Sequence, residues 1–254
     1  MSKLLIVANW KANPDAPGRA AILASKVEKE IKSIRGVDVV LAPAHLHLIP
    51  VKNVLKKAKL GAQNMFWGGC GPYTGEVSWH HLKHLKIKYV IIGHSERRAN
   101  LGETDEMVNK KIKAALDNGF TPILCVGERQ RHEEEISPEI EEQLRSALFG
   151  VKSSLLKGLV VAYEPVWAIS TNPGAKPDTS ANAFRVQIHI RKIISSLYGA
   201  KVARAVRVIY GGSVNAKNIA GFLSEGKMQG ALVGGASLRP EEFGEIVRIA
   251  ASLR

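Results

Sequence analysis

Residues 89–96 read YVIIGHSE and residues 159–165 read LVVAYEP, and in each stretch an uninterrupted apolar run ends abruptly in polar residues. A strand with one face in water alternates apolar and polar side chains, whereas a strand that is buried on both faces is apolar throughout. Both runs are therefore predicted to be strands of a parallel sheet that is covered by helices.

Similar runs, rich in Val and Ile, recur along the chain at intervals of roughly thirty residues. The eight predicted strands are 4–8, 37–42, 60–63, 89–92, 122–126, 159–163, 206–209 and 231–233. Helical periodicity marks the segments 20–34, 78–86, 103–116, 136–148, 181–197 and 240–253. Strands that alternate with helices form parallel βαβ units, and eight units in 254 residues predict an α/β fold, a single-domain (β/α)8 barrel over residues 1–254.

An open doubly wound sheet is the structural alternative. Its nucleotide signature is a GxGxxG turn after the first strand, whereas residues 9–18 of this chain read NWKANPDAPG. No linker-like tract divides the chain, so we expect one domain.

Composition narrows the class of protein. With 45% hydrophobic and 23% charged residues, the chain has the material for a large core and is neither disordered nor of low complexity. Two cysteines, Cys70 and Cys125, cannot supply a disulfide framework or a four-thiolate zinc site, which favours a reducing cytoplasm. No apolar stretch is long enough for a signal-peptide core or a membrane span, so we expect a soluble, cytoplasmic protein.

Polar residues follow several of the predicted strands, where a barrel of this kind carries its chemistry. Asn9, Lys11, His94 and Glu164 are expected on one rim. A carboxylate can abstract a proton next to a carbonyl, a neutral imidazole can donate a hydrogen bond to the enediolate, and an ammonium can stabilise its charge. Taken singly, Glu164 could be a salt-bridged rim residue, Lys11 a solvated lysine and His94 a core histidine, so the hypothesis depends on their joint placement.

Glycines follow the seventh and eighth predicted strands, in YGGS at 210–213 and VGG at 233–235. Barrels often build a phosphate site in these two loops, because glycine lets backbone N–H groups approach the oxygens. The pair of loops indicates a phosphate monoester as ligand.

These motifs resemble the triosephosphate isomerase family. The matching segments are ANWK at 8–11, GAQN at 61–64, TGE at 74–76, IIGHSERR at 91–98, CVGE at 125–128, AYEPVWAI at 162–169, YGGS at 210–213 and LVGGASL at 232–238. The resemblance covers essentially the whole chain and implies a TIM barrel and an isomerase. That enzyme interconverts dihydroxyacetone phosphate and D-glyceraldehyde 3-phosphate through an enediolate, in glycolysis and gluconeogenesis, without metal or cofactor.

The resemblance also implies a role for each site residue. Glu164 is expected to be the base and His94 the neutral electrophile, while Asn9 and Lys11 contact the substrate oxygens. The remaining expected site residues are Ser95 and Glu96 as supporting residues, Ser170, Ser213, Gly234 and Gly235 as phosphate ligands, and Ile169 and Leu232 as an apolar roof.

Two loops depart from common family versions. The lid, in which the family usually carries Gly-Thr-Gly, reads STNPG at 170–174 and is expected to be about three residues longer, with the Ser170 amide closing on the phosphate. The loop at 65–73, with Cys70 between glycines, also differs, and in the family this region and TGE pack into a partner subunit. The resemblance therefore implies a homodimer, and the segment 67–74 would expose Trp67 and Tyr73 unless a second subunit covers them.

Other functions fit the sequence less well. An aldolase-type lyase would need a Schiff-base lysine late in the barrel, and the late strands end without one. A net charge of +13 permits nucleic-acid binding, but Lys and Arg are dispersed among the helices and no RNP-like or zinc-knuckle pattern is present. We therefore expect a small phosphorylated substrate and neither nucleic acid nor membrane as partner. A catalytically dead relative is disfavoured because Asn9, Lys11, His94 and Glu164 are all present.

Overall fold

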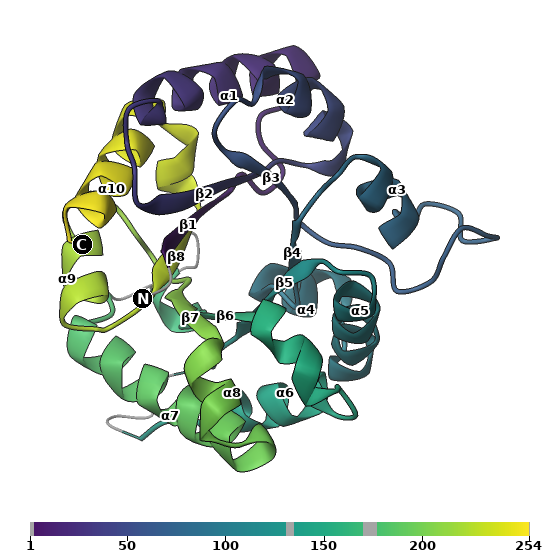
Figure 1. The fold of residues 1–254 in the computed structure, drawn as a ribbon, viewed down its shortest axis with the longest axis vertical. Coiled ribbons are helices and arrows are strands. Elements are labelled where there is room, and N and C mark those ends of the chain that lie inside the picture. The colour runs from purple at the N-terminus through teal and green to yellow at the C-terminus, as the bar shows by residue number, and fades with distance from the viewer. Residues whose placement is uncertain (1–2, 131–134, 170–176, 254) are drawn as a thin grey trace.

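Eight parallel strands close into a barrel in the order in which they occur in the chain, with the helices around it (Figure 1). The computed structural model describes residues 3–130, 135–169 and 177–253. The strands are β1 (Leu4–Asn9), β2 (Val37–Ala42), β3 (Lys59–Ala62), β4 (Tyr89–Ile92), β5 (Thr121–Val126), β6 (Val160–Tyr163), β7 (Arg207–Tyr210) and β8 (Gly230–Val233). The predicted (β/α)8 barrel is confirmed, and β1 pairs with both β2 and β8 to close it.

Helices connect the strands and form the outer wall. They are α1 (Pro17–Ile31), α2 (Leu48–Val54), α3 (Trp79–His84), α4 (Ser95–Leu101), α5 (Asp105–Asp117), α6 (Pro138–Leu148), α7 (Ser180–Tyr198), α8 (Ala200–Ala205), α9 (Ile219–Ser224) and α10 (Pro240–Ser252). Short 3-10 turns are η1 (His45–His47), η2 (Ser153–Gly158), η3 (Val166–Ala168) and η4 (Gly235–Leu238). The first and last helices, α1 and α10, pack against each other and complete the wall.

Each strand buries both of its faces. In β1, Leu5 and Val7 point into the barrel, whereas Ile6 and Ala8 belong to the layer between strands and helices, and all four are fully buried. This two-sided burial is the physical reason for the missing alternation in the sequence.

Helix boundaries differ from the prediction at α1, which was expected over 20–34. It begins at Pro17, because the fixed φ of proline suits the first helical position, and it ends at Ile31, its last buried residue. The short helices α2, α4, α8 and α9 were not predicted. No helix in the described part of the chain combines the length and the apolar character that crossing a membrane requires.

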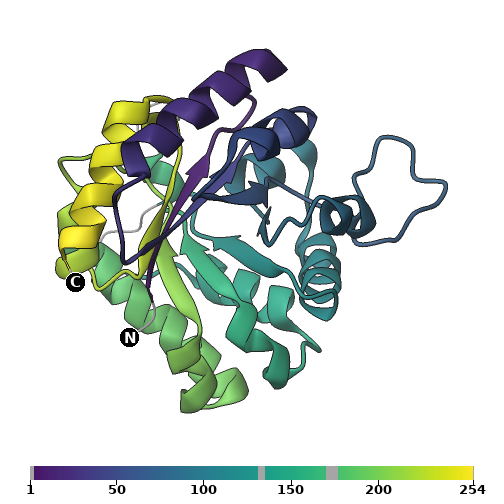
Figure 2. The same ribbon diagram turned by 45° about the horizontal axis from the view of Figure 1, so that its top comes forward.

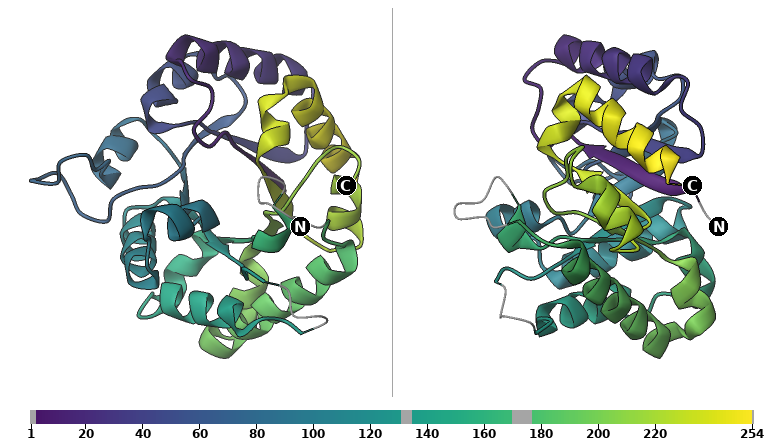
Figure 3. Two further views of the ribbon diagram at one scale, coloured as in Figure 1. Left: turned by 180° about the vertical axis from the view of Figure 1, so that it is seen from behind. Right: turned by 90° about the vertical axis from the view of Figure 1, so that its left-hand side faces the viewer.

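One loop stands out from the wall of helices. The segment between β3 and α3 projects away from the barrel in Figures 1 and 2, and the view from behind in Figure 3 shows the same projection. An isolated bridge between Phe66 and Ser78 closes its base. The Phe66 ring packs on Trp67 and Tyr73, with centroid distances of 4.5 and 4.6 Å. Trp67 is only half-buried and Tyr73 is 47% exposed.

Candidate active site

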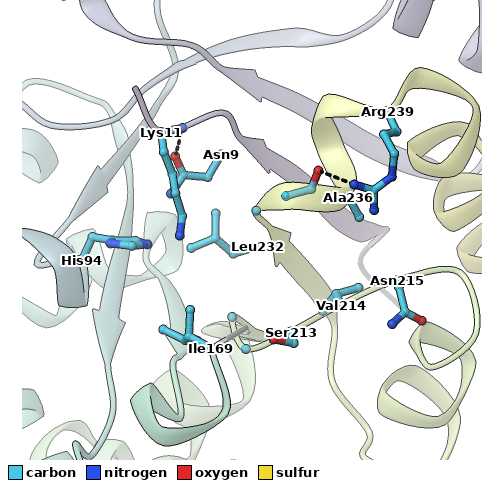
Figure 4. A pocket seen from close by; sticks show the side chains of 14 residues that line it. Asn9, Lys11, His94, Ile169, Ser213, Val214, Asn215, Leu232, Ala236 and Arg239 are labelled. Atoms are coloured by element: carbon cyan, nitrogen blue, oxygen red, sulfur yellow. Dashed lines mark hydrogen bonds between the residues drawn. The ribbon is translucent and has the colours of Figure 1, made fainter. Parts of the chain in front are cut away.

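A cavity of about 240 Å³ opens at the carboxyl ends of β1, β4, β7 and β8. Figure 4 shows Lys11 and His94 on one side of it, Ile169 and Leu232 beside them, and Ser213 across from them. The sequence-predicted residues that line it are Asn9, Lys11, His94, Ile169, Ser213, Leu232, Gly234 and Gly235. Ser170 lies outside the described residues.

Lys11 has a strained backbone that its neighbours hold in place. Its φ is +52°, a left-handed conformation that side chains other than glycine rarely adopt. Its N–H donates to Asn9 Oδ1 at 3.1 Å, and Gln63 Nε2 donates to the carbonyls of Lys11 and Ala42, both at 2.8 Å. The Lys11 ammonium forms an ion pair with Glu96 Oε1 at 2.5 Å. This set of contacts holds Lys11 at the edge of the cavity, with its ammonium paired to Glu96.

His94 lies between β4 and α4 and caps the helix. Its Nδ1 accepts a hydrogen bond from the Glu96 N–H at 3.2 Å, so in the neutral ring the proton sits on Nε2. That Nε2 lies 3.2 Å from Glu164 Oε1. The preceding Gly93 has φ +75°, which only glycine adopts readily, and its N–H donates to Glu103 Oε1 at 3.0 Å. The turn therefore holds the imidazole with Nδ1 as acceptor and Nε2 facing Glu164 at the rim.

Glu164 is 1% exposed and directly follows β6. Its Oε2 accepts from the Ser95 N–H at 2.9 Å, whereas Oε1 makes no hydrogen bond within the described residues, since the nearby His94 Nε2 is not in bonding geometry. Space for the side chain comes from Gly211, where a Cβ would stand 2.9 Å from Glu164 Cγ. The carboxylate lies behind the 240 Å³ cavity and does not line it. It therefore holds one free acceptor oxygen in a buried site.

The opposite side of the cavity is built from the loops after β7 and β8. Gly211, Gly212 and Ser213 line it from the first loop, and Gly234 and Gly235 from the second. Ser213 Oγ donates to the carbonyl of Ala168 at 2.7 Å, which ties the first loop to η3. Close backbone approach at these glycines suits phosphate oxygens.

Glu128, at the end of β5, anchors η3. Its Oε1 accepts from Trp167 Nε1 at 2.6 Å and from the Tyr163 hydroxyl at 2.9 Å. Burial raises the pKa of the Glu128 carboxyl. The neighbouring Cys125 is fully buried, and burial, followed by the charge of Glu164, raises the pKa of its thiol. Cys125 therefore stays a neutral packing residue, while Glu128 fixes the segment that follows Glu164.

Sequence reasoning missed four residues that line the cavity, Val214, Asn215, Ala236 and Arg239, of which Asn215 and Arg239 carry polar side chains. Arg239 follows η4, donates from Nε to Glu242 Oε2 at 2.6 Å, and also lies near the Gly235 carbonyl (Figure 4). The available signal was position, because both residues follow strands whose ends meet at the same rim. The hydrogen bonds from Gln63 Nε2 to the Lys11 and Ala42 carbonyls were not predicted either.

Comparisons with known proteins agree with this geometry. The family model described as Triosephosphate isomerase matches residues 4–250. The triosephosphate isomerase of Dictyoglomus thermophilum is 44% identical over 252 residues, which cover 98% of this chain and 100% of the relative. That of Dehalococcoides mccartyi is 43% identical over 258 residues, with 100% and 99% covered, and that of Caldanaerobacter subterraneus is 44% identical over 251 residues, with 97% and 99% covered. This chain belongs to the triosephosphate isomerase family.

Proposed function

We propose that the chain is a triosephosphate isomerase that interconverts dihydroxyacetone phosphate and D-glyceraldehyde 3-phosphate, with Glu164 as the base. The observation that carries this proposal is the buried Glu164 carboxylate with one acceptor oxygen free, 3.2 Å from His94 Nε2. The relatives described above carry the same activity in their names.

The reaction is a proton transfer between two neighbouring carbons. Glu164 takes a proton from C1 of dihydroxyacetone phosphate, and the C–H electron pair forms the C1–C2 double bond of an enediolate. His94 Nε2–H donates a hydrogen bond to the oxygen that gains charge, and the Lys11 ammonium stabilises that charge together with the Asn9 amide. The Glu164 carboxyl then returns the proton to C2, while the oxygens exchange one proton, which gives glyceraldehyde 3-phosphate.

Substrate binding has to rearrange two contacts. Glu164 leaves the Ser95 N–H and turns toward the cavity, and Lys11 turns from Glu96 toward the anionic substrate. The Lys11–Glu96 pair is partly exposed, with side chains 22% and 38% accessible, so it costs little to open. Ser95 and Glu96 act in this proposal as supports that hold the resting positions of base and ammonium.

The phosphate is proposed to bind at Ser213, Gly234 and Gly235, whose backbone lies at the cavity. Ile169 and Leu232 form the apolar roof that keeps water from the enediolate. The proposed contact from the Ser170 amide and the longer lid fall on residues outside the described ranges, and they stay predictions. The reaction needs no metal or cofactor in this proposal, because the chain supplies the base and all polarising groups.

We also propose a homodimer in the cytoplasm that serves glycolysis and gluconeogenesis. The projecting loop between β3 and α3 supports the dimer, because Tyr73 on this loop is 47% exposed and aromatic anchors are enriched at interfaces. Two free cysteines, Cys70 and Cys125, fit a reducing compartment.

A coupled assay tests the activity. Purified chain is given glyceraldehyde 3-phosphate, and the dihydroxyacetone phosphate that forms is reduced by a glycerol phosphate dehydrogenase while NADH is followed. We expect turnover that saturates with substrate and persists after borohydride treatment in the presence of substrate. An aldolase-type lyase would instead be trapped by borohydride as a lysine adduct. Absence of turnover in the folded chain would refute the proposal.

A further inference from the structure

The end of the barrel opposite the candidate active site is strongly basic. In a closed parallel barrel the starts of all strands share one face. Every strand except β5 has an exposed lysine or arginine within the three residues before its start. We call this surface the basic face, and its members are Lys3, Arg35, Lys56, Lys86, Lys88, Lys157, Arg204 and Lys227. In the side view of Figure 3, β1, in purple, spans the barrel between the two faces.

Acidic side chains neutralise little of this charge. Within residues 3–130, 135–169 and 177–253, no member of the basic face forms an ion pair. Asp38 is occupied by Lys59 at 3.0 Å and Arg207 at 3.5 Å, two further cations near strand starts. Asp117 lies before β5, the one strand without a cation at its start. The basic face therefore presents a ring of cations that is open on one side.

Two of these lysines occupy strained positions. Lys86 has φ +58° and Lys227 has φ +50°, and Lys11 of the candidate active site is the third non-glycine residue with positive φ in the described part of the chain. Lys86 ends α3 in a motif in which glycine is usual, with its own N–H bonded to Lys83 O at 2.9 Å and the Ile87 N–H bonded to Leu82 O at 3.0 Å. A strained residue that persists points to a use for its side chain. A positive charge near the C-terminal end of a helix is favourable, but this effect does not require the lysine to have a left-handed backbone conformation.

The fold changes the interpretation of the charge. Lys and Arg are dispersed along the sequence, and that dispersal was the reason to expect no nucleic-acid partner. The barrel collects these scattered cations, since segments far apart in the chain all return to the same face before each strand. Dispersal along the sequence is therefore compatible with a concentrated patch in space.

We propose that the basic face binds the phosphate backbone of double-stranded nucleic acid without sequence preference. Cations distributed around a barrel end cannot converge on one small anion, whereas a duplex offers many phosphates at regular spacing. Within the three residues before each strand, the described residues expose no large hydrophobic or aromatic side chain, and Phe149, 77% exposed farther back on the segment before β6, lies under Lys113 Nζ at 5.7 Å from its ring centroid. Insertion into a lipid surface and stacking on single-stranded bases both need such side chains.

Binding at this face leaves the opposite, catalytic rim open. The inference is independent of the proposed isomerase activity, because no member of the basic face lines the 240 Å³ cavity. Isomerase activity can therefore serve as a check on folding for every variant.

The test is a fluorescence anisotropy titration of the whole chain against a labelled DNA duplex of about 20 base pairs, repeated between about 20 and 200 mM salt. The variant K86G with K227G removes two charges and relieves strain at both positions, so it is expected to fold at least as well as the unmodified chain. If each lysine meets one phosphate, affinity falls on the order of 50-fold at 0.1 M salt and the salt slope becomes shallower by about 1.8. Lys157→Ala with Arg204→Ala provides a second pair at ordinary positions of the same face.

The matched control is Lys26→Ala with Lys192→Ala, which removes the same charge from exposed positions on α1 and α7. We expect the control to change affinity less than threefold and all variants to keep full isomerase activity. Equal loss in control and test pairs would show that bulk charge drives binding and would overturn the proposal. Binding to phosphatidylserine vesicles with no binding to the duplex would overturn it in favour of a membrane partner.

Discussion

Adding one methyl group at Gly211 should impair catalysis through Glu164. The Cβ of Gly211→Ala would stand 2.9 Å from Glu164 Cγ and 3.1 Å from the Tyr163 carbonyl oxygen. Carbon atoms in favourable contact are about 3.5–4.0 Å apart, so Cγ has to move by roughly 0.6–1.1 Å. A misplacement of about 1 Å at a catalytic group can cost about 100-fold in rate. We expect kcat to fall roughly 30- to 100-fold, at most about 2.7 kcal/mol, while KM changes less than threefold.

The coupled isomerase assay measures this effect, and circular dichroism and thermal unfolding report the fold. Gly18→Ala is the matched control, because a Cβ at Gly18 meets nothing within 4 Å. It should leave kcat unchanged and stabilise α1 slightly, by up to about 1 kcal/mol. A folded Gly211→Ala variant with kcat within twofold of the unmodified chain would refute the claim that Glu164 needs the space that Gly211 leaves.

Three further predictions test the charge of Lys11, the anchoring of η3 by Glu128 and the proposed dimer. Lys11→Met should raise KM and lower kcat, each at least about tenfold, with little loss of stability because the pair with Glu96 is partly exposed; a change in stability alone would contradict the role of Lys11. Burial raises the pKa of the Glu128 carboxyl, so the folded state holds the carboxyl proton more tightly than the unfolded state does. The stability of the unmodified chain relative to Glu128→Gln should therefore fall as pH rises above about 4.3. Thermal unfolding of both proteins at pH 4 and 7.5 checks this, and a stability difference that does not change with pH would refute it. Tyr73→Ser should weaken the dimer at least about tenfold in light scattering across a dilution series, and an unchanged dimer would place the interface elsewhere.

The strands could be predicted because burial on both faces leaves a signal in the sequence. Leu5 and Val7 fill the barrel while Ile6 and Ala8 meet the helices, and this produces a run without polar residues. Two of the short helices, α4 and α8, left no such signal. α4 buries no residue at all and α8 buries Ala203 alone, so neither has the apolar stripe by which a helix is recognised.

The candidate site could be predicted as a set of residue types but not as a geometry. Strand ends indicated Lys11, His94 and Glu164, since the carboxyl ends of parallel strands share one rim. The resting position of Glu164 on the Ser95 N–H depends on a contact between residues 69 positions apart, and no local pattern encodes it. The hydrogen bond from Gln63 Nε2 to the Lys11 carbonyl joins residues 52 positions apart, and no local sequence pattern predicts it either.

The most direct test of the central claim is kcat of Glu164→Gln in the coupled isomerase assay. Glutamine keeps the size of the side chain and can still accept from the Ser95 N–H, but it cannot take a proton from carbon. Loss of a general base is worth about 10² to 10⁴ or more in rate, roughly 3–5 kcal/mol. The account predicts a fall in kcat of that size with unchanged thermal unfolding. A correctly folded variant that keeps kcat within tenfold of the unmodified chain would contradict Glu164 as the base.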